Sequence, residues 1–302
     1  MKVSQFYKHT WMLSLVLAAL TWSSCKKDGN PNNLPDVSPE AYAGKIDGFN
    51  NSDEVFPTNL VAYWTFDGNK TEKVSNTAAT SSSNDSYADN GVKGQALNLN
   101  GGYVYYASSL NAFKTAALKS FTISLWAQIL NNGTKKTMLF QLARPNNFNG
   151  SINFVLETNA RAAAVLDAIT VHPTFTTSTG GTQDNLNTAV APSPFLSPKI
   201  GADKWTNFVI TFDAPTGVLQ IWGDGVKIGT TAYQNRGANS FFAFEPSEII
   251  IGGNYNVIPG KTVNTDVSFA PMTGKIDEIR VYNTALPDAH IKALYNLGLA
   301  KK

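Results

Sequence analysis

The stretch "DKWTNFVITFDAPTGVLQIWGDGVKIGTT", residues 203–231, alternates apolar and polar side chains and contains two turn signals. Ala-Pro-Thr-Gly at 214–217 and Gly-Asp-Gly at 223–225 each separate runs rich in Val, Ile and aromatic residues. Alternation with a period of two is typical of β-strands, and short glycine-containing turns between such runs indicate hairpins. The stretch therefore predicts consecutive hairpins of an antiparallel meander.

The rest of the chain beyond residue 59 repeats this pattern. Further alternating runs are "LVAYWTFDG" at 60–68, "ALNLNGGYVYYA" at 96–107, "SFTISLWAQIL" at 120–130 and "SEIIIGGN" at 247–254. One helix is predicted, in "LPDAHIKALYNLG" at 286–298, with Pro287 in its first turn and Gly298 at its end. Ile291, Leu294 and Tyr295 would face the sheets. Many short strands and one short C-terminal helix predict an all-β, two-sheet antiparallel sandwich.

The N-terminal residues 1–24 are not expected to belong to the fold. Lys2 and Lys8 precede the apolar run "WMLSLVLAAL" and the small residues of "TWSSC", an arrangement typical of an export signal. The chain has one cysteine, Cys25, so no intramolecular disulfide is possible. The stretch "SSCKKDGN" resembles a bacterial lipoprotein signal, which implies cleavage after Ser24 and lipidation of Cys25. The alternative is a plain secreted protein with a chance cysteine.

Residues 25–58 are rich in Asn, Asp, Pro, Gly and Ser, which predicts a lipidated N-terminus followed by a flexible tether. The folded domain is then expected at 59–302. The charges directly after Cys25 resemble the signals that place lipoproteins on the outer face of the outer membrane. Several acyl chains would anchor the chain stably without a membrane-spanning helix.

The charge of the chain does not suggest a nucleic-acid surface. The formal net charge is +2, from 24 basic and 22 acidic residues. Lys2 and Lys8 belong to the predicted signal, which holds no acid, so the remainder carries equal numbers of basic and acidic residues. Nucleic-acid binding domains carry a clear basic excess. No nucleic-acid partner is therefore expected.

Five stretches, taken in order, carry a family resemblance. They are "LVAYWTFDGN", "VKGQALNLNGGYV", "FTISLWAQ", residues 203–231 and "GKIDEIRVYNTALPDAHIKALYN". From about residue 60 to 297 the chain resembles the laminin-G-like, concanavalin A-like jelly-roll family. The resemblance implies a curved two-sheet jelly roll, of the kind found in lectins, laminin G modules and laminarinase-like glycoside hydrolases. The same sandwich carries enzymes, sugar-binding modules and protein-binding adhesins, so the sites decide the function.

The residues do not support catalysis. Laminarinase-like hydrolases carry E-x-D-x-x-E on one strand, and no E-x-D occurs in this chain. The nearest similar pattern is "KIDEIR", where Asp277 and Glu278 are adjacent and alternation would point them to opposite faces. Asp277 would then share a face with Ile279, and Glu278 would form a modest surface ion pair with Arg280. His172 and His290 show no zinc-site spacing, so no enzyme activity is expected.

Asp277 has two possible roles at the margin of the core. Backbone N–H groups of a turn would satisfy its carboxylate. Alternatively, the family resemblance implies a structural Ca²⁺ held by Asp67, by the carbonyl of Gly101 or Gly102, and by Asp277. Hard oxygen ligands of this kind suit Ca²⁺.

Aromatic residues give only weak ligand-site candidates. Trp64, Trp126, Trp205 and Trp222 lie in strand-like runs and are expected to pack in the core. Sugar binding needs exposed aromatic faces beside polar groups, and the candidates that fit by composition are Tyr233, Asn254 and Tyr255. The first hypothesis is thus a surface lipoprotein with a carbohydrate-binding, non-catalytic jelly roll, working with partner proteins of a carbohydrate-uptake system. The alternatives are a protein-binding adhesin or structural module and a divergent glycoside hydrolase.

Overall fold

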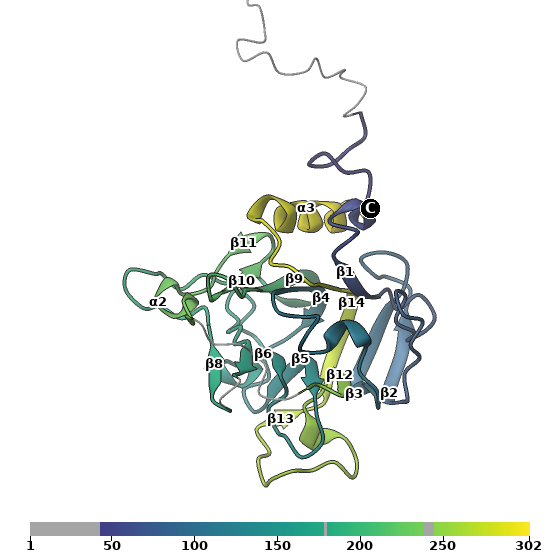
Figure 1. Cartoon of the computed structure of the whole chain (residues 1–302), viewed down its shortest axis with the longest axis vertical. Helices are drawn as coiled ribbons and strands as arrows, with labels where there is room; N and C mark the ends of the chain where they lie inside the picture. The colour runs from purple at the N-terminus through teal and green to yellow at the C-terminus, as the bar shows by residue number, and fades with distance from the viewer. Residues whose placement is uncertain (1–42, 178–179, 238–244) are drawn as a thin grey trace, which may run out of the picture. The chain divides into compact units, whose positions relative to one another are not determined.

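The computed structural model describes residues 43–177, 180–237 and 245–302, and its compact unit runs from Gly44 to Lys302 (Figure 1). The predicted signal peptide, Cys25 and the first part of the predicted tether lie outside the described residues. The compact unit begins at Gly44 rather than at the expected boundary of residue 59, because apolar side chains between the two positions pack onto the fold. None of the described helices is long and apolar enough to cross a membrane.

Strands dominate the described residues. They are β1 (Leu60–Trp64), β2 (Ser81–Ala88), β3 (Ala96–Tyr106), β4 (Phe121–Ile129), β5 (Lys136–Ala143), β6 (Ile152–Leu156), β7 (Thr174–Thr176), β8 (Thr182–Asp184), β9 (Gly201–Asp213), β10 (Val218–Gly223), β11 (Val226–Lys227), β12 (Glu248–Ile251), β13 (Phe269–Ala270) and β14 (Met272–Tyr282). The helical elements are α2 (Thr231–Gln234), α3 (Asp288–Leu299) and the single 3₁₀ turns η2 (Ser52–Glu54), η3 (Asn111–Phe113), η4 (Thr158–Ala160) and η5 (Tyr255–Val257).

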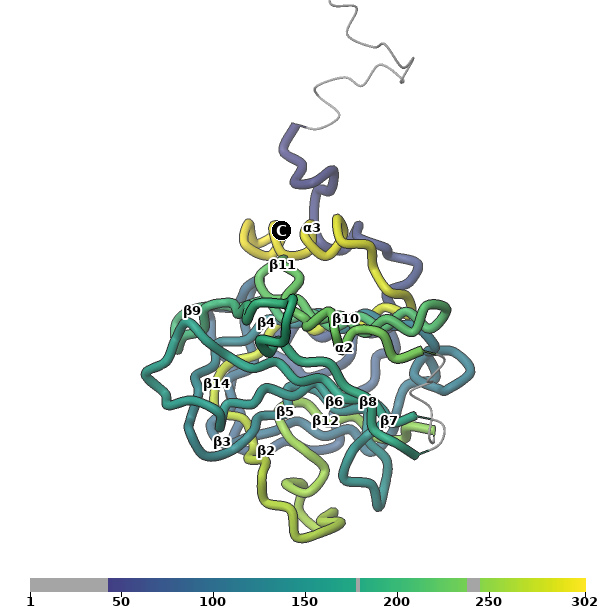
Figure 2. Tube along the Cα trace, turned by 90° about the vertical axis from the view of Figure 1, so that its left-hand side faces the viewer, coloured from purple at the N-terminus to yellow at the C-terminus, as the bar shows by residue number. Residues whose placement is uncertain are grey.

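The strands form two stacked layers (Figures 1 and 2). The first layer is β11-β10-β9-β4-β14, with β1 paired to the C-terminal part of β14, and the second is β2-β3-β12-β5-β6-β7-β8. Strand β3 joins the layers, because it pairs with β14 through its first half and with β12 through its second. All pairings between the described strands are antiparallel except that of β13 with β5. The predicted antiparallel jelly-roll sandwich is confirmed.

The main core lies between the layers. Strands β4 and β9 contribute Ile123, Leu125 and Phe208 from the first layer, and β5 and β6 contribute Phe140 and Phe154 from the second. The two hairpins predicted at 203–231 form as β9-β10 and β10-β11. Phe208, Ile210 and Phe212, alternate residues of β9, all face the main core.

A second, smaller core covers the outer side of the first layer. Helix α3 packs there through Ile291 and Leu294, as predicted, against Trp222 and Tyr282. A Cβ atom on Gly298 would lie 2.3 Å from Cζ2 of Trp126, so the close approach of the helix end to β4 requires glycine. Figure 1 shows α3 lying along this side of the sandwich.

The segment before β1 completes this smaller core. Val55 is 1% exposed and belongs to the same cluster as the helix residues, and Phe49 and Phe56 pack against it. The backbone N–H of Ser52 donates to the carbonyl oxygen of Lys302 at 3.3 Å, which links the beginning of the unit to its end. Residues 44–58, whose sequence shows no periodic pattern, are thus part of the fold.

Candidate functional site

Three adjacent strands carry polar side chains in one row on their outer side. Lys275 of β14 lies opposite Asn98 of β3 and, on its other side, opposite Gln128 of β4. The sequence neighbours of these residues, such as Leu97 and Ile276, are buried in the core between the layers. Because successive side chains of a strand point to opposite faces, the three polar residues point away from that core and share one face.

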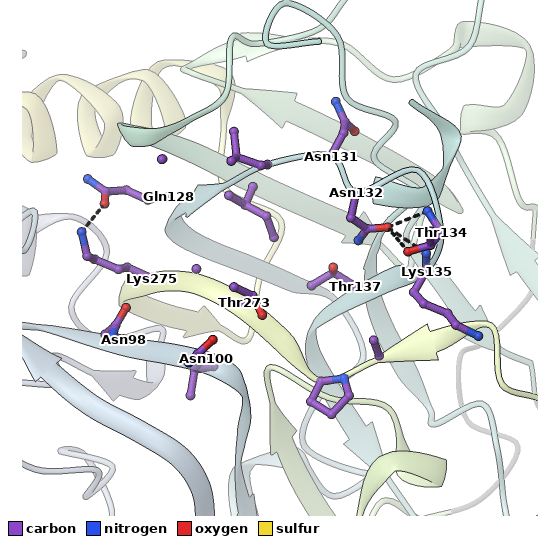
Figure 3. Close-up of a pocket in the computed structure, with 17 residues that line it drawn as sticks. Asn98, Asn100, Gln128, Asn131, Asn132, Thr134, Lys135, Thr137, Thr273 and Lys275 are labelled. Carbon is purple, nitrogen blue, oxygen red and sulfur yellow. Dashed lines mark hydrogen bonds between the residues drawn. The ribbon is translucent and has the colours of Figure 1, made fainter. Parts of the chain in front are cut away.

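This row forms one wall of a cleft of about 680 Å³, at the corner where the first halves of β3 and β14 and the end of β4 meet the beginning of β5 (Figure 3). We call it the amide cleft. None of the described residues that line it is Asp or Glu. Its polar lining consists of Asn98, Asn100, Gln128, Asn131, Asn132, Thr134, Lys135, Thr137, Thr273 and Lys275.

Several polar groups of the amide cleft retain hydrogen-bonding capacity for a ligand. Asn131 is not one of them, because its amide is buried and its Nδ2 donates to two backbone carbonyl oxygens. Oε1 of Gln128 accepts a hydrogen bond from Nζ of Lys275 at 2.8 Å, which orients the amide so that its Nε2 remains as a donor. The side chain of Asn100 is exposed at the cleft wall. Gln128 and Asn100 therefore offer amide groups to a ligand.

Asn132 builds the rim of the cleft. Its Oδ1 accepts the backbone N–H groups of Thr134 and Lys135, both at 2.8 Å, and its Nδ2 donates to the hydroxyl of Thr158 at 3.0 Å. Nζ of Lys135 donates to the carbonyl oxygen of Val267 at 2.5 Å. These bonds fix the turn between β4 and β5 before any ligand arrives.

A second cavity, of about 310 Å³, lies beside the amide cleft and shares Gln128 with it. We call it the Trp205 cavity. Trp205 is half-buried and its indole N–H donates to the carbonyl oxygen of Asn90 at 3.0 Å, which holds the ring in place. The other lining residues are Gly91, Val92, Trp126, Asp203, Gly298, Leu299 and Lys301.

The four tryptophans expected to pack in the core divide into two groups. Trp64, Trp126 and Trp222 are buried, as predicted. Trp126 also stacks on Tyr295 of α3, with ring centroids 5.7 Å apart and planes 14° apart. Trp205 differs, because the pairing of β9 with β4 shifts register directly beyond its neighbour Thr206. That irregularity leaves its ring at the wall of a cavity.

The acidic pair at 277–278 does not lie as alternation predicted. A β-bulge inserts one residue between Asp277 and Arg280, and Glu278 adopts a φ of 52°. The bulge reverses the phase of the strand, so Ile276 and Ile279 both face the main core and Asp277 lies on the opposite side from Ile279. The predicted sharing of a face by Asp277 and Ile279 is therefore wrong.

Glu278 and Arg280 form a buried ion pair, not the surface pair that was predicted. They are 2% and 4% exposed, and their charged groups are 2.6 Å apart. The hydroxyl of Tyr63 donates to the Glu278 carboxylate at 2.7 Å, and Arg280 also pairs with Asp53 at 2.7 Å. The segment before β1 and the loop around residue 93 cover this side of β14. Neither Asp277 nor Glu278 is accessible to a substrate.

Asp277 is satisfied by backbone amides, which was one of its two expected roles. Its carboxylate accepts the N–H groups of Val92 at 2.7 Å, Lys93 at 3.3 Å and Glu278 at 2.8 Å. Burial, with the charge of Glu278 beside it, raises the pKa of Asp277 to about 8 against the opposing effect of these amides. Asp67 holds the same loop from its other end, by accepting the N–H of Gln95 at 2.8 Å.

The residues proposed to bind calcium do not form one coordination shell. Gly102 lies five positions along β3 from Leu97, the partner of Ile276, which places it about 16 Å from the Asp277 region. Among the described residues, no group of three or more His, Asp, Glu or Cys side chains is arranged to hold a metal ion. Calcium binding stays a prediction, and melting with and without a chelator tests it. A lower Tm in chelator would support the ion, and an unchanged Tm would leave the amide contacts as the role of Asp277.

The three weak ligand candidates lie outside both cavities. Asn254 is fully buried and donates to the carbonyl oxygen of Phe148, while Tyr255 is 3% exposed and packs in a cluster with Tyr105. As placed, neither offers an exposed face. Tyr233 is half-buried in α2, where Arg236 lies over its ring.

His172 joins three segments of the second layer through charges. Its Nδ1 contacts the carboxylate of Glu157 and its Nε2 that of Asp184, both at 2.8 Å, and Glu157 also pairs with Lys136. Burial acts to lower the pKa of His172, but the hydrogen bonds to Asp184 and Glu157 outweigh it and raise the pKa to about 9. His172 thereby lowers the pKa of both carboxyl groups.

We expect stability to fall as pH rises from 7 to 10 because of His172. The folded pKa is raised, so the contribution is fully present below the unfolded pKa of about 6.5 and is lost as pH passes through about 9. The loss should be about 1–3 kcal/mol, since Asp184 is partly exposed and screened. Urea unfolding across this pH range measures it, and His172→Gln should show a flatter profile. An equal slope in both proteins would contradict the assignment.

Comparison with known proteins places this geometry in a family. Residues 100–292 match the family model of the concanavalin A-like lectin/glucanases superfamily. No curated protein matches the chain in sequence.

Solved structures share the fold at low sequence identity. Domain 4 of AbnA, a GH43 extracellular arabinanase from Geobacillus stearothermophilus in complex with arabinotriose, is 18% identical with a TM-score of 0.50, over 78% of this chain and 98% of that one. The binding domain of Paraclostridial Mosquitocidal Protein 1 is 16% identical with a TM-score of 0.50, over 79% and 52%. The binding domain of botulinum neurotoxin serotype D/C VPI 5993 is 15% identical with a TM-score of 0.50, again over 79% and 52%. The match thus spans about half of each toxin domain, and these likenesses show the jelly-roll fold.

Proposed function

We propose that this chain, which belongs to the concanavalin A-like lectin/glucanases superfamily, binds a carbohydrate in the amide cleft without cleaving it. The observation that carries the proposal is the lining of the cleft, where amide, hydroxyl and ammonium groups from four strands and their turns converge. Sugar hydroxyls are both donors and acceptors. An amide side chain offers both functions on one rigid plane, so Asn and Gln match them.

The scaffold suits recognition because the side chains are held before binding. Asn98, Gln128 and Lys275 sit on paired strands, and the ammonium group of Lys275 fixes the amide of Gln128. A ligand then loses little affinity to ordering of the site.

The same lining supports the proposal that the bound carbohydrate is not cleaved. Hydrolysis of a glycosidic bond generally needs two carboxyl groups on either side of it. The described residues of the amide cleft include none, and the adjacent acids Asp277 and Glu278 are buried elsewhere. We therefore expect no release of reducing sugar from any polysaccharide that binds. Sustained release would favour the divergent glycoside hydrolase instead.

We further propose that the domain acts at the cell surface as an outer-membrane lipoprotein. The support is the sequence pattern around Cys25, which resembles a lipidation signal followed by a turn-rich tether. Partner proteins of a carbohydrate-uptake system would then receive the captured glycan. Mass analysis of the membrane fraction tests the anchor, since the mature chain should begin at an acylated Cys25. An unmodified chain that starts at another residue would contradict it.

Asn100→Ala should weaken glycan binding about 5-fold, the cost of one lost hydrogen bond. The residue is exposed at the cleft wall and no contact of the fold depends on its side chain, so we expect an unchanged Tm. Retardation in native gels containing polysaccharide measures the effect. Linear arabinan is the first choice, because the arabinanase domain of the same fold was solved with arabinotriose, and neutral and acidic polysaccharides follow.

The matched control is Asn111→Ala, another exposed asparagine that lies in η3 outside the cleft. It should bind like the wild type. Equal binding by both variants would place the carbohydrate elsewhere on the domain. Failure of the wild type to bind any polysaccharide would favour the adhesin alternative.

A further inference from the structure

We propose that the bound glycan continues from the amide cleft into the Trp205 cavity, so that the domain recognises a run of linked sugars within a chain instead of one terminal sugar. The inference rests on the proposed function and adds the length of the ligand to it. Its starting point is Gln128, which lines both cavities. The two sites therefore adjoin at a single side chain.

The order of the strands makes the two cavities one continuous path. Ala127 of β4 pairs with Thr206 of β9, and the register shifts directly beyond this pair. Gln128 and Trp205, the next residue along each strand, both line the Trp205 cavity. On its other side Gln128 is opposite Lys275, which is opposite Asn98. The path from Asn98 to Trp205 thus crosses four neighbouring strands, or about 14 Å, which is longer than one sugar ring.

The Trp205 cavity supplies the surface that the amide cleft lacks. None of the described residues that line the amide cleft is aromatic, whereas the second cavity has the indole of Trp205 and the side chain of Leu299, which is 59% exposed. Asp203 and Lys301 stand at its wall as hydrogen-bonding partners. A sugar ring has an apolar C–H face and a polar edge. An aromatic side chain beside charged and amide groups matches both.

The position of the indole is fixed by its surroundings. The N–H of Trp205 donates to the carbonyl oxygen of Asn90, and Trp126, which lines the same cavity, is held by its stack on Tyr295. A rigid aromatic side chain loses little conformational entropy when a ligand packs on it, and truncating such a side chain has a large effect on binding.

Calorimetry with one oligosaccharide series, from the disaccharide to the hexasaccharide, tests the inference. Linear arabino-oligosaccharides are the first probe, and otherwise the series of the polysaccharide that most retards the wild type. We expect wild-type affinity to rise with length. Trp205→Ala should bind the hexasaccharide about 10-fold more weakly and the disaccharide like the wild type.

Two further proteins keep the test decisive. Trp205→Phe keeps a ring, so it should stay folded and retain most of the long-chain affinity, but it should lose the change in tryptophan fluorescence that long chains cause in the wild type. Phe195→Ala truncates a half-buried aromatic side chain outside both cavities and should bind like the wild type.

The outcomes separate this inference from the proposed function. Affinity that does not depend on chain length, or a Trp205→Ala variant that matches the wild type at every length, would overturn the extended path and leave carbohydrate binding in the amide cleft intact. A wild-type protein that no polysaccharide retards would overturn the proposed function itself, and the extended path with it.

Discussion

Arg280→Met is expected to lower the free energy of unfolding by about 3–5 kcal/mol. The guanidinium group is buried and lies 2.6 Å from the carboxylate of Glu278 and 2.7 Å from that of Asp53. Glu278 is 2% exposed, so after the substitution its charge would remain buried with only the hydroxyl of Tyr63 to stabilise it. Urea unfolding at neutral pH measures the loss.

Two comparisons isolate the buried charge as the cause. The double substitution Glu278→Leu and Arg280→Met removes both charges, and we expect it to be more stable than Arg280→Met alone. Lys227→Met breaks an exposed pair, in which the charged atoms are 3.2 Å apart and Asp288 is 72% exposed, and should cost less than about 1 kcal/mol. Similar losses in the free energy of unfolding for Lys227→Met and Arg280→Met would show that burial of the Glu278–Arg280 pair does not cause the loss.

This pair also shows where reasoning from the sequence fails. Alternation correctly identifies "KIDEIRVY" as a strand, but it assumes one residue per position and so places Asp277 on the side of Ile279. The bulge at Glu278 inserts an extra residue. Ile276 and Ile279 are three apart and both face the core, a spacing that a regular strand cannot produce. The sequence did contain one sign of the bulge, because two charged residues, Asp277 and Glu278, stand between the core residues Ile276 and Ile279.

The fold was predictable because its signals are local. Each hairpin of 203–231 needs only its own turn and alternation, and the helix at 286–298 only its own pattern. The candidate site is different. Lys275 and Gln128 are brought together by the order of β4, β14 and β3, which no short window reveals. Amide side chains also give weak sequence signals, since Asn and Gln are common on any surface.

Trp205 was missed for a related reason. The residue lies in a strand-like run, where tryptophan usually packs in the core, and three of the four tryptophans expected there do so. Its exposure depends on the register shift between β4 and β9, a property of the pairing and not of either strand alone. The position of a pairing irregularity decided which aromatic side chain is available to a ligand.

A chain that begins at residue 59 should be less stable than one that begins at residue 44 by on the order of 4 kcal/mol or more. The lost segment contains Val55, which is 1% exposed, and Phe49 and Phe56, which pack beside it on the smaller core. Removing the segment exposes apolar surface on α3 and on the first layer. It also removes Asp53, one of the two carboxylates that pair with Arg280. Thermal and urea unfolding of the two chains measure the difference.

Single substitutions in the longer chain show whether packing is the cause. Val55→Ser should cost about 1.5–3 kcal/mol, the effect of removing a fully buried side chain, whereas Val74→Ser should cost little because Val74 is 51% exposed. Equal stability of the two chains would mean that residues 44–58 do not stabilise the fold and belong to the tether, as the sequence predicts. The segment reads as a tether because its apolar residues are isolated among turn-forming ones, without periodicity. Isolated apolar residues can still pack when a sheet has an apolar outer face that is otherwise uncovered. The start of this domain is therefore set by the outer face of the first layer and not by the pattern of the segment itself.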